Sequence, residues 1–179
     1  ADLIPDQVRH AREHFARRDP NRATVAEDHC FDGFEAYKRL IDFVDIDVVL
    51  MATPPHFRPA HYEYAVHAGK HCFVEKPVAV DAPGIRRVMA ANKIAQEKKL
   101  TVVSGLCWRY DLGVRETMKR VQDGAIGDVI AVQENYNAGF LWHKARKPEW
   151  TDMEYQIRNW LYYTWLSGDH NVEQHVHSL

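Results

Sequence analysis

The sequence predicts an α/β fold with an open parallel sheet, followed by the start of an α+β unit with a mainly antiparallel sheet. Short apolar runs at 45–53, 70–77 and 100–106 have the composition of buried strands, and segments of helical periodicity separate them. A polar–apolar alternation follows at 127–137. Short strands that alternate with helices are typical of right-handed β-α-β units, which form a parallel sheet.

Two helices are expected before the first strand. Residues 9–18 have a helical composition. Residues 33–43 carry four large apolar side chains at helical spacing: Phe34, Tyr37, Leu40 and Ile41. The continuous apolar run at 45–53 then predicts a strand with helices on both of its faces, because strands of parallel sheets are usually buried on both sides.

Two more helices and two more strands are expected to follow. Residues 60–67 predict a helix that Gly69 closes, since glycine readily adopts the left-handed conformation found at helix ends. The run at 70–77 predicts the second strand, and Asp81 is a suitable N-cap for the next helix. One face of that helix is apolar: Ile85, Val88, Met89 and Ala95. The run at 100–106 predicts the third strand.

The region after the third strand predicts a second structural unit. One face of the alternation at 127–137 carries Ile130, Val132, Glu134 and Tyr136. This period-two pattern predicts the first strand of an antiparallel sheet. All five tryptophans lie in this unit: Trp108, Trp142, Trp150, Trp160 and Trp165. Such aromatic enrichment suits stacking on carbohydrate, and it suits a subunit interface equally well.

The composition favours a small neutral ligand. The 23 basic and 25 acidic residues give a formal net charge of −2, and no block of like charge stands out, so nucleic acid and anionic membrane surfaces are disfavoured partners. No apolar stretch approaches the ~20 residues that a membrane span requires. Three cysteines without paired spacing indicate reduced thiols. The compartment stays open: we expect the cytoplasm by default, but any export signal would lie before Ala1.

A charged pair stands at the end of the second predicted strand. Parallel strands end at the same edge of a sheet, so Thr53, Glu75 and Gly105 are expected to meet there, together with Lys76. A lysine at this edge can face a bound ligand in a partly desolvated cleft. The alternative is an ordinary surface pair of Glu75 and Lys76, with Pro77 ending the strand.

Residues 51–81, MATPPHFRPAHYEYAVHAGKHCFVEKPVAVD, combine a strand, a TP turn, a histidine, a helix, GKH and EKP. With GLCWRYD and GAIGDVIAVQENYN further on, the chain resembles the glucose-fructose oxidoreductase, inositol dehydrogenase and rhizopine-catabolism (Gfo/Idh/MocA) family of NAD(P)-dependent oxidoreductases. The resemblance implies a Rossmann-type domain over residues 1–106 and a substrate and oligomerisation domain over residues 107–179. The family's first strand and glycine-rich G-x-G-x-x-G turn are missing, so both domains are expected to be partial.

The resemblance implies hydride transfer between a nicotinamide cofactor, NAD or possibly NADP, and a sugar, polyol or sugar derivative. The residues implied for cofactor binding are Asp2, Thr53, Pro54, His56, His61, Glu75 and Lys76. Asp2 would bind the ribose 2′-OH; its alternative role is an N-cap. Arg109 and Tyr136 are candidates for substrate hydroxyls, and an interdomain ion pair is the alternative for Arg109. A homo-oligomer through the sheet of the second domain is also implied.

The resemblance also places the acid/base near the end of the chain, where Glu173 and His177 stand at the positions of the family's Asp-x-x-x-His, with glutamate in place of the usual aspartate. Residues four apart share a helical face, so Glu173 is expected to hold or polarise His177 and to raise its pKa above ~6.5. His177 would accept the hydroxyl proton as the alcohol is oxidised, and Lys76 would stabilise the charge on the reacting oxygen. We expect no metal site.

Three alternative functions remain open at this point. Some relatives are glycosidases that use bound NAD for transient oxidation and elimination, and a non-catalytic sugar-binding protein is the second possibility. The third is a metal site of two histidines and one carboxylate: His170, Glu173 and His177, with His175 nearby. With such a metal site, the lysine at the sheet edge would have no role in the chemistry.

Overall fold

The computed structural model describes residues 1–43 and 45–178 and contains one sheet of three parallel strands in the order β1-β2-β3. The strands are β1 (Val48–Met51), β2 (His71–Val74) and β3 (Val102–Ser104). Val49 pairs with Cys72, and Cys72 pairs with Val102. The alternation of strand and helix predicted over this part of the chain is therefore confirmed.

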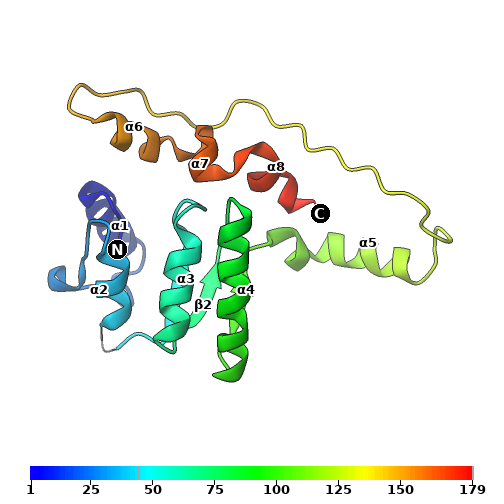
Figure 1. Cartoon of the computed structure of the whole chain (residues 1–179), viewed down its shortest axis with the longest axis horizontal. Helices are drawn as coiled ribbons and strands as arrows, with labels where there is room; N and C mark the ends of the chain where they lie inside the picture. The colour runs from blue at the N-terminus through cyan, green and yellow to red at the C-terminus, as the bar shows by residue number, and fades with distance from the viewer. Residues whose placement is uncertain (44, 179) are drawn as a thin grey trace.

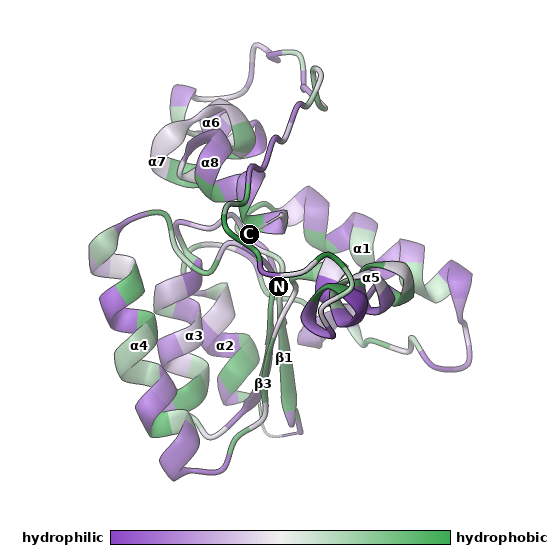
Figure 2. Ribbon diagram, turned by 90° about the vertical axis from the view of Figure 1, so that its right-hand side faces the viewer, coloured by the Kyte–Doolittle hydropathy of each residue, from purple (hydrophilic) through white to green (hydrophobic). Residues whose placement is uncertain are grey.

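Three helices cover one face of this sheet (Figure 2). They are α2 (Ala36–Asp42), α3 (Arg58–His67) and α4 (Ala82–Glu97). The core between them and the strands consists mainly of aliphatic residues and one tyrosine: Ile41, Val49, Met51, Tyr62, Ala65, Val66, Val74, Val88, Ala91 and Ala95. The hydroxyl of buried Tyr62 donates to Asn92 Oδ1 at 2.6 Å, so its polar end is satisfied.

The ends of the two crossover helices follow from local chemistry. Asp81 is the N-cap of α4, and its carboxylate accepts from the backbone N–H of Gly84 at 2.7 Å. Gly69 follows α3 with a φ of +75°, a conformation that favours glycine. Both boundaries agree with the sequence predictions.

The apolar face of α4 is narrower than predicted. Val88 and Ala95 are buried as expected, but Ile85 and Met89 are 42% and 59% exposed. The buried side of the helix runs through Val88, Ala91 and Ala95, which lie three and four residues apart. Ile85 and Met89 lie beside this stripe, so only part of the predicted apolar face is buried.

The second face of β1 is largely exposed, contrary to the prediction that helices cover both faces of this strand. Val48 is 56% exposed and Leu50 77% exposed. Successive residues of a strand point to opposite faces, and the helices α2, α3 and α4 all lie on the side of Val49 and Met51. Within residues 1–43 and 45–178, the outward side chains of β1 therefore remain accessible.

The N-terminal segment begins with a short bridge and a helix. Asp2 forms an isolated parallel bridge with Asp32, and α1 (Pro5–Arg18) follows. This helix confirms the prediction at residues 9–18 and extends it toward the N-terminus. Proline at the start of α1 is favourable because its missing N–H has no partner there in any helix.

The predicted antiparallel strand at 127–137 is absent from the structure. After α5 (Leu112–Gln122), residues 127–147 contain no helix or strand and return as a long loop toward α6 (Figure 1). Ile130 and Val132 are 96% and 83% exposed. An alternating pattern sets the direction of side chains, but a strand also needs a neighbour for its backbone hydrogen bonds. No other segment among the described residues pairs with this one.

The last part of the chain lies across the carboxyl edge of the sheet (Figure 1). Its helices are α6 (Asp152–Arg158), α7 (Thr164–Ser167) and α8 (Asp169–Glu173). Short 3₁₀ turns occur at Glu27–His29, Cys107–Tyr110, Trp160–Tyr162 and His175–His177. The backbone N–H of His56 donates to the carbonyl of Leu166 at 3.1 Å, which ties this segment to the loop after β1.

A bilayer-spanning helix would need a long apolar stretch. None of the helices in the described part of the chain has the length and hydropathy for this.

Candidate active site

Lys76 lies at the carboxyl edge of the sheet, in the turn that follows β2. We call residues 75–77 the Lys76 turn. The ammonium of Lys76 donates to Oε1 of Glu173 at 2.7 Å and to the carbonyl oxygen of Glu173 at 2.5 Å. The two side chains are only 11% and 7% exposed. Lys76 is therefore a largely buried cation held by a residue 97 positions away, and not a member of a surface pair with Glu75.

Glu173 is a buried carboxylate with one partner missing. Burial raises the pKa of its carboxyl, although Lys76 and Arg58 act in the opposite direction. Its Oε2 atom is buried and accepts no hydrogen bond from the described residues. Because one oxygen holds the ammonium and the other is unsatisfied, the carboxylate can accept a further hydrogen bond from a bound molecule.

Glu75 occupies the space between the ends of β2 and β3. A Cβ atom at Gly105 would lie 2.5 Å from Oε2 of Glu75, so glycine is required for the carboxylate to lie there. The backbone N–H of Lys76 donates to the same oxygen at 3.3 Å. The structure thus brings Glu75, Lys76 and Gly105 to one edge, as the strand order predicted.

His177 is not on a helical face with Glu173, contrary to expectation. Helix α8 ends at Glu173, and His177 belongs to the 3₁₀ turn that follows. Burial, and then the charge of Lys76, lower the pKa of His177, while Glu75 acts in the opposite direction. The expected upward shift was wrong because the carboxylate of Glu173 binds Lys76 instead.

Aromatic and imidazole rings gather around His177. Its Nδ1 lies 3.7 Å from the sulfur of Cys107, and its ring stacks 6.3 Å from Tyr136. Trp108 lies 6.0 Å from His177 and 6.2 Å from Tyr136, measured between ring centroids. Two of the predicted site residues, Tyr136 and His177, are therefore neighbours, whereas Arg109 is exposed and its side chain has no ion-pair partner within residues 1–43 and 45–178.

The three residues of the metal alternative do not assemble into a ligand set. His170 contacts the carbonyl oxygen of Tyr136 at 3.1 Å through Nε2, and Glu173 binds Lys76. In the described part of the chain, no three histidine, cysteine or acidic side chains group in a way that could hold a metal ion.

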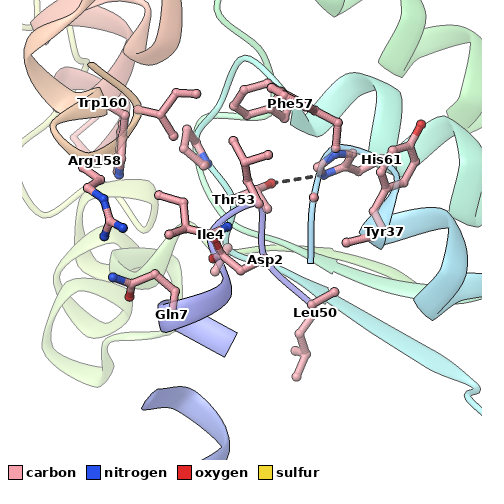
Figure 3. Close-up of a pocket in the computed structure, with 18 of the residues that line it drawn as sticks. Asp2, Ile4, Gln7, Tyr37, Leu50, Thr53, Phe57, His61, Arg158 and Trp160 are labelled. Carbon is pink, nitrogen blue, oxygen red and sulfur yellow. Dashed lines mark hydrogen bonds between the residues drawn. The ribbon is translucent and has the colours of Figure 1, made fainter. Parts of the chain in front are cut away.

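A pocket of about 410 Å³ lies beside the end of β1 (Figure 3). It collects four of the residues predicted for cofactor binding: Asp2, Thr53, Pro54 and His61. Its remaining walls are mainly apolar and come from residues 1–57 and 142–160, including Ile4, Tyr37, Leu50, Phe57, Trp142, Ile157 and Trp160. The pocket therefore brings together segments that the sequence separates by more than a hundred residues.

Asp2 is held by a local hydrogen bond. Its Oδ1 accepts from the backbone N–H of Ile4 at 2.9 Å. Ile4, and not Asp2, is the N-cap of α1, so the N-cap alternative for Asp2 was wrong. The carboxylate lies in the pocket between Thr53 and Gln7 (Figure 3), where its remaining lone pairs can accept hydroxyl hydrogens.

His61 is a neutral, partly buried ring of this pocket. Burial lowers the pKa of its imidazole to about 4. Its Nδ1 lies 3.3 Å from the hydroxyl of Thr53, and its ring lies 4.2 Å from that of Tyr37. His56, by contrast, is exposed and packs its ring 5.2 Å from Trp165, outside the pocket. Of the two histidines predicted to bind the cofactor, His61 therefore lies in the pocket and His56 lies outside it.

Acid should destabilise the fold through His61. The pKa of His61 is about 4 in the folded chain and ordinarily 6.5. Its contribution to the free energy of unfolding is therefore complete above pH 6.5 and is lost as the pH falls through about 4. Between pH 7 and 4, the free energy of unfolding should fall by about 3 kcal/mol at most through this group. Urea unfolding at a series of pH values should show a flatter profile for His61→Gln. His67→Gln, at an exposed position of the same helix, is the control and should keep the parental slope.

Arg58 is the main residue of the site that sequence reasoning missed. It is 3% exposed, and its Nη1 donates to the carbonyl oxygens of Glu75 and Pro77, at 3.0 and 2.6 Å. The sequence offers one signal, an arginine between apolar residues in PPHFRPA, at the start of a helix that is otherwise largely buried. Charged residues are rarely fully buried without partners, so a buried arginine at this position indicates hydrogen-bond acceptors nearby.

Comparison with known proteins identifies one family of oxidoreductases. The model of an oxidoreductase family with an NAD-binding Rossmann fold, Gfo/Idh/MocA, matches residues 6–105. Inositol 2-dehydrogenase of Agrobacterium fabrum is 37% identical over 125 residues, which cover 65% of this chain and 35% of that protein. The chain spans between 26% and 40% of the length of the curated relatives that it matches.

Two solved structures resemble the chain. Scyllo-inositol dehydrogenase from Lactobacillus casei, with bound NAD(H) and scyllo-inositol, is 26% identical with a TM-score of 0.54; the match covers 70% of this chain and 33% of that one. Aldose-aldose oxidoreductase from Caulobacter crescentus, complexed with glycerol, matches 96% of this chain and 44% of that one with a TM-score of 0.63. Its identity is 22%, so this second likeness concerns the fold alone.

Proposed function

Because the chain belongs to the Gfo/Idh/MocA oxidoreductase family, we propose that the protein transfers a hydride between a nicotinamide cofactor and a sugar, polyol or sugar derivative. The observation that supports this most directly is the position of Lys76, a largely buried cation at the carboxyl edge of a parallel sheet. Ligands of open α/β sheets bind outside this edge. Relatives named inositol dehydrogenases favour a polyol as the substrate class.

The chain offers a suitable place for the nucleoside part of NAD. The carboxylate of Asp2 can accept hydrogen bonds from ribose hydroxyls, and Leu50 and Trp160 supply apolar walls for a base. Lys144 adds a positive charge to the lining. When bound, the nicotinamide cofactor accepts or supplies the hydride. An acidic residue at the ribose disfavours a 2′-phosphate, so NAD is proposed in preference to NADP.

Lys76 is proposed to stabilise the oxygen of the reacting carbinol. A lysine ammonium has three N–H donors, and Glu173 accepts two hydrogen bonds from it. The third donor is available for a substrate oxygen, where developing negative charge would be stabilised. Glu173 thus acts as the group that orients Lys76, and Glu75 would hydrogen-bond the ribose beside it.

His177 is proposed to accept the hydroxyl proton during alcohol oxidation. The neutral form of its imidazole is needed for this step. Burial and Lys76 lower its pKa, so this form is the stable one at neutral pH. Tyr136, stacked on His177, is a proposed contact for other substrate hydroxyls, and the exposed side chain of Arg109 is proposed as a second one.

We also propose the division into a dinucleotide-binding domain at 1–106 and a substrate domain at 107–179. The antiparallel sheet expected of the second domain, and a homo-oligomer formed through it, belong to this proposal. The exposed apolar residues Ile130, Val132 and Phe140 support it, because such side chains are normally covered by another strand or subunit.

The test is an assay of the purified protein with NAD and a panel of inositols, aldoses and glycosides. Polyol-dependent formation of NADH is the expected result. Release of sugar from glycosides without accumulation of NADH would instead support a glycosidase with recycled NAD. Saturable sugar binding without either reaction would support a non-catalytic relative.

Binding of NAD to the 179-residue chain should be weak. Residues 1–179 contain no G-x-G-x-x-G turn, whose backbone N–H groups would bind the pyrophosphate at a helix N-terminus. Calorimetric titration with NAD should therefore need high ligand concentrations. Tight binding would show that other groups hold the phosphates, and Lys144→Ala, which changes a cation lining the pocket, would then identify one of them.

A further inference from the structure

We propose that Arg58 is a positioning residue that holds the Lys76 turn in its working geometry, an inference that rests on the function proposed for Lys76. Arg58 is the first residue of α3 and donates from one nitrogen to two carbonyl oxygens. These carbonyls belong to Glu75 and Pro77, the residues on either side of Lys76. A single guanidinium group therefore clamps the backbone before and after the lysine.

The electrostatics of Arg58 fit positioning better than simple space filling. Burial lowers the pKa of its guanidinium to about 10, while the charges of Glu173 and Glu75 act in the opposite direction, so the group stays charged at neutral pH. Its Nε is buried without a partner among the described residues. Burial of a charge and of an unpaired donor is unfavourable. What the charge provides is two strong hydrogen bonds to the Lys76 turn.

Two groups from outside the sheet thus act on one lysine. Arg58, from α3, binds the carbonyl oxygens of the residues before and after Lys76, and Glu173, from α8, binds its ammonium. The lysine side chain has several rotatable bonds, so its ammonium has a defined position only if both ends are held. A displacement of about 1 Å at a reacting group can lower the rate by about a hundredfold. Release of the clamp should therefore affect kcat more than the KM of either substrate.

The test compares three variants by the reactivity of single lysines toward an acetylating N-hydroxysuccinimide ester, read by mass spectrometry. Arg58→Met removes both hydrogen bonds, and Arg58→Lys keeps the charge without the planar fork. Arg87→Met, at a surface position paired with Glu63, is the matched control. Lys76 should be acetylated slowly in the parent chain, since its side chain is 11% exposed and donates two hydrogen bonds.

In Arg58→Met, the acetylation rate of Lys76 should rise about tenfold or more, as expected for loss of a hydrogen bond to a charged group. Arg58→Lys should show a smaller rise, and Arg87→Met none. Lys98, which donates to the carbonyl of His67 at the other end of α3, reports general loosening and should keep its parental rate. An equal rise at Lys98 would indicate a structural role and overturn the proposal.

An unchanged rate at Lys76 in a folded Arg58→Met variant would also overturn the clamp. If circular dichroism shows that Arg58→Met does not fold, Arg58→Lys decides: a selective rise at Lys76 supports the proposal, and a parental rate refutes it. The reactivity of Lys76 does not depend on turnover. The proposed function can therefore fail, for example through an unaffected Lys76→Ala enzyme, while the clamp is still judged on its own result.

Discussion

Replacement of Lys76 by alanine should lower turnover by about 10²- to 10³-fold, the effect of removing one donor to a developing oxyanion. The variant should also be less stable, because Glu173 is then left buried without the cation that it binds. Turnover should be measured at saturating NAD and polyol, with circular dichroism to confirm folding. Lys93→Ala, at an exposed position on α4, is the control and should behave like the parent.

Loss of stability and loss of a catalytic group can be separated with a second variant. Lys76→Met combined with Glu173→Gln removes both charges together, so no uncompensated carboxylate remains buried. We expect this double variant to regain stability but not turnover. Parental turnover in either lysine variant would refute the role assigned to the ammonium of Lys76.

Replacement of His177 by asparagine should remove most activity and abolish the acid limb of the pH profile. The parent should gain activity as the pH rises through the ionisation of His177, because only the neutral ring accepts a proton. Burial and the charge of Lys76 lower the pKa of this ring, so the midpoint of the limb should lie below 6.5. The measurement is kcat as a function of pH for alcohol oxidation.

The control for this prediction is His175→Asn, in the same 3₁₀ turn. Its ring also contacts Tyr136, so a general disturbance of the turn would appear in both variants, whereas loss of the limb should be specific to His177→Asn. Glu173→Gln should leave the midpoint of the limb near its parental value, since Glu173 binds Lys76. A limb that persists in His177→Asn would assign the ionisation to another group, and activity that requires added divalent metal would contradict the acid/base role.

Much of the first 106 residues could be predicted from local patterns. The apolar runs predicted three strands, and the chemistry of Asp81 and Gly69 predicted helix ends that the structure contains. The position of Lys76 followed as well, because parallel strands joined by right-handed crossovers must all end at one edge. These features depend on residues close in sequence or on a general rule of chain connection.

The partners within the site could not be predicted in the same way. The spacing of Glu173 and His177 suggested one helical face, but α8 ends at Glu173, whose carboxylate turns to Lys76. The contacts of Arg58 with the Lys76 turn were missed for a related reason, since a sequence pattern shows which residues are charged and not which carbonyls remain unpaired near them.

The sequence by itself therefore determined the family motifs, the alternation of strands and helices, and the edge at which Lys76 stands. Only the tertiary structure decided that Glu173 holds this lysine, that Arg58 clamps its turn, and that residues 127–137 form no strand within the described chain. The physical reason is the range of the interactions. Helical periods and caps depend on residues a few positions apart. An ion pair between positions 97 apart forms only where the folded chain brings both partners together, and the same is true of a hydrogen-bonded ladder between strands.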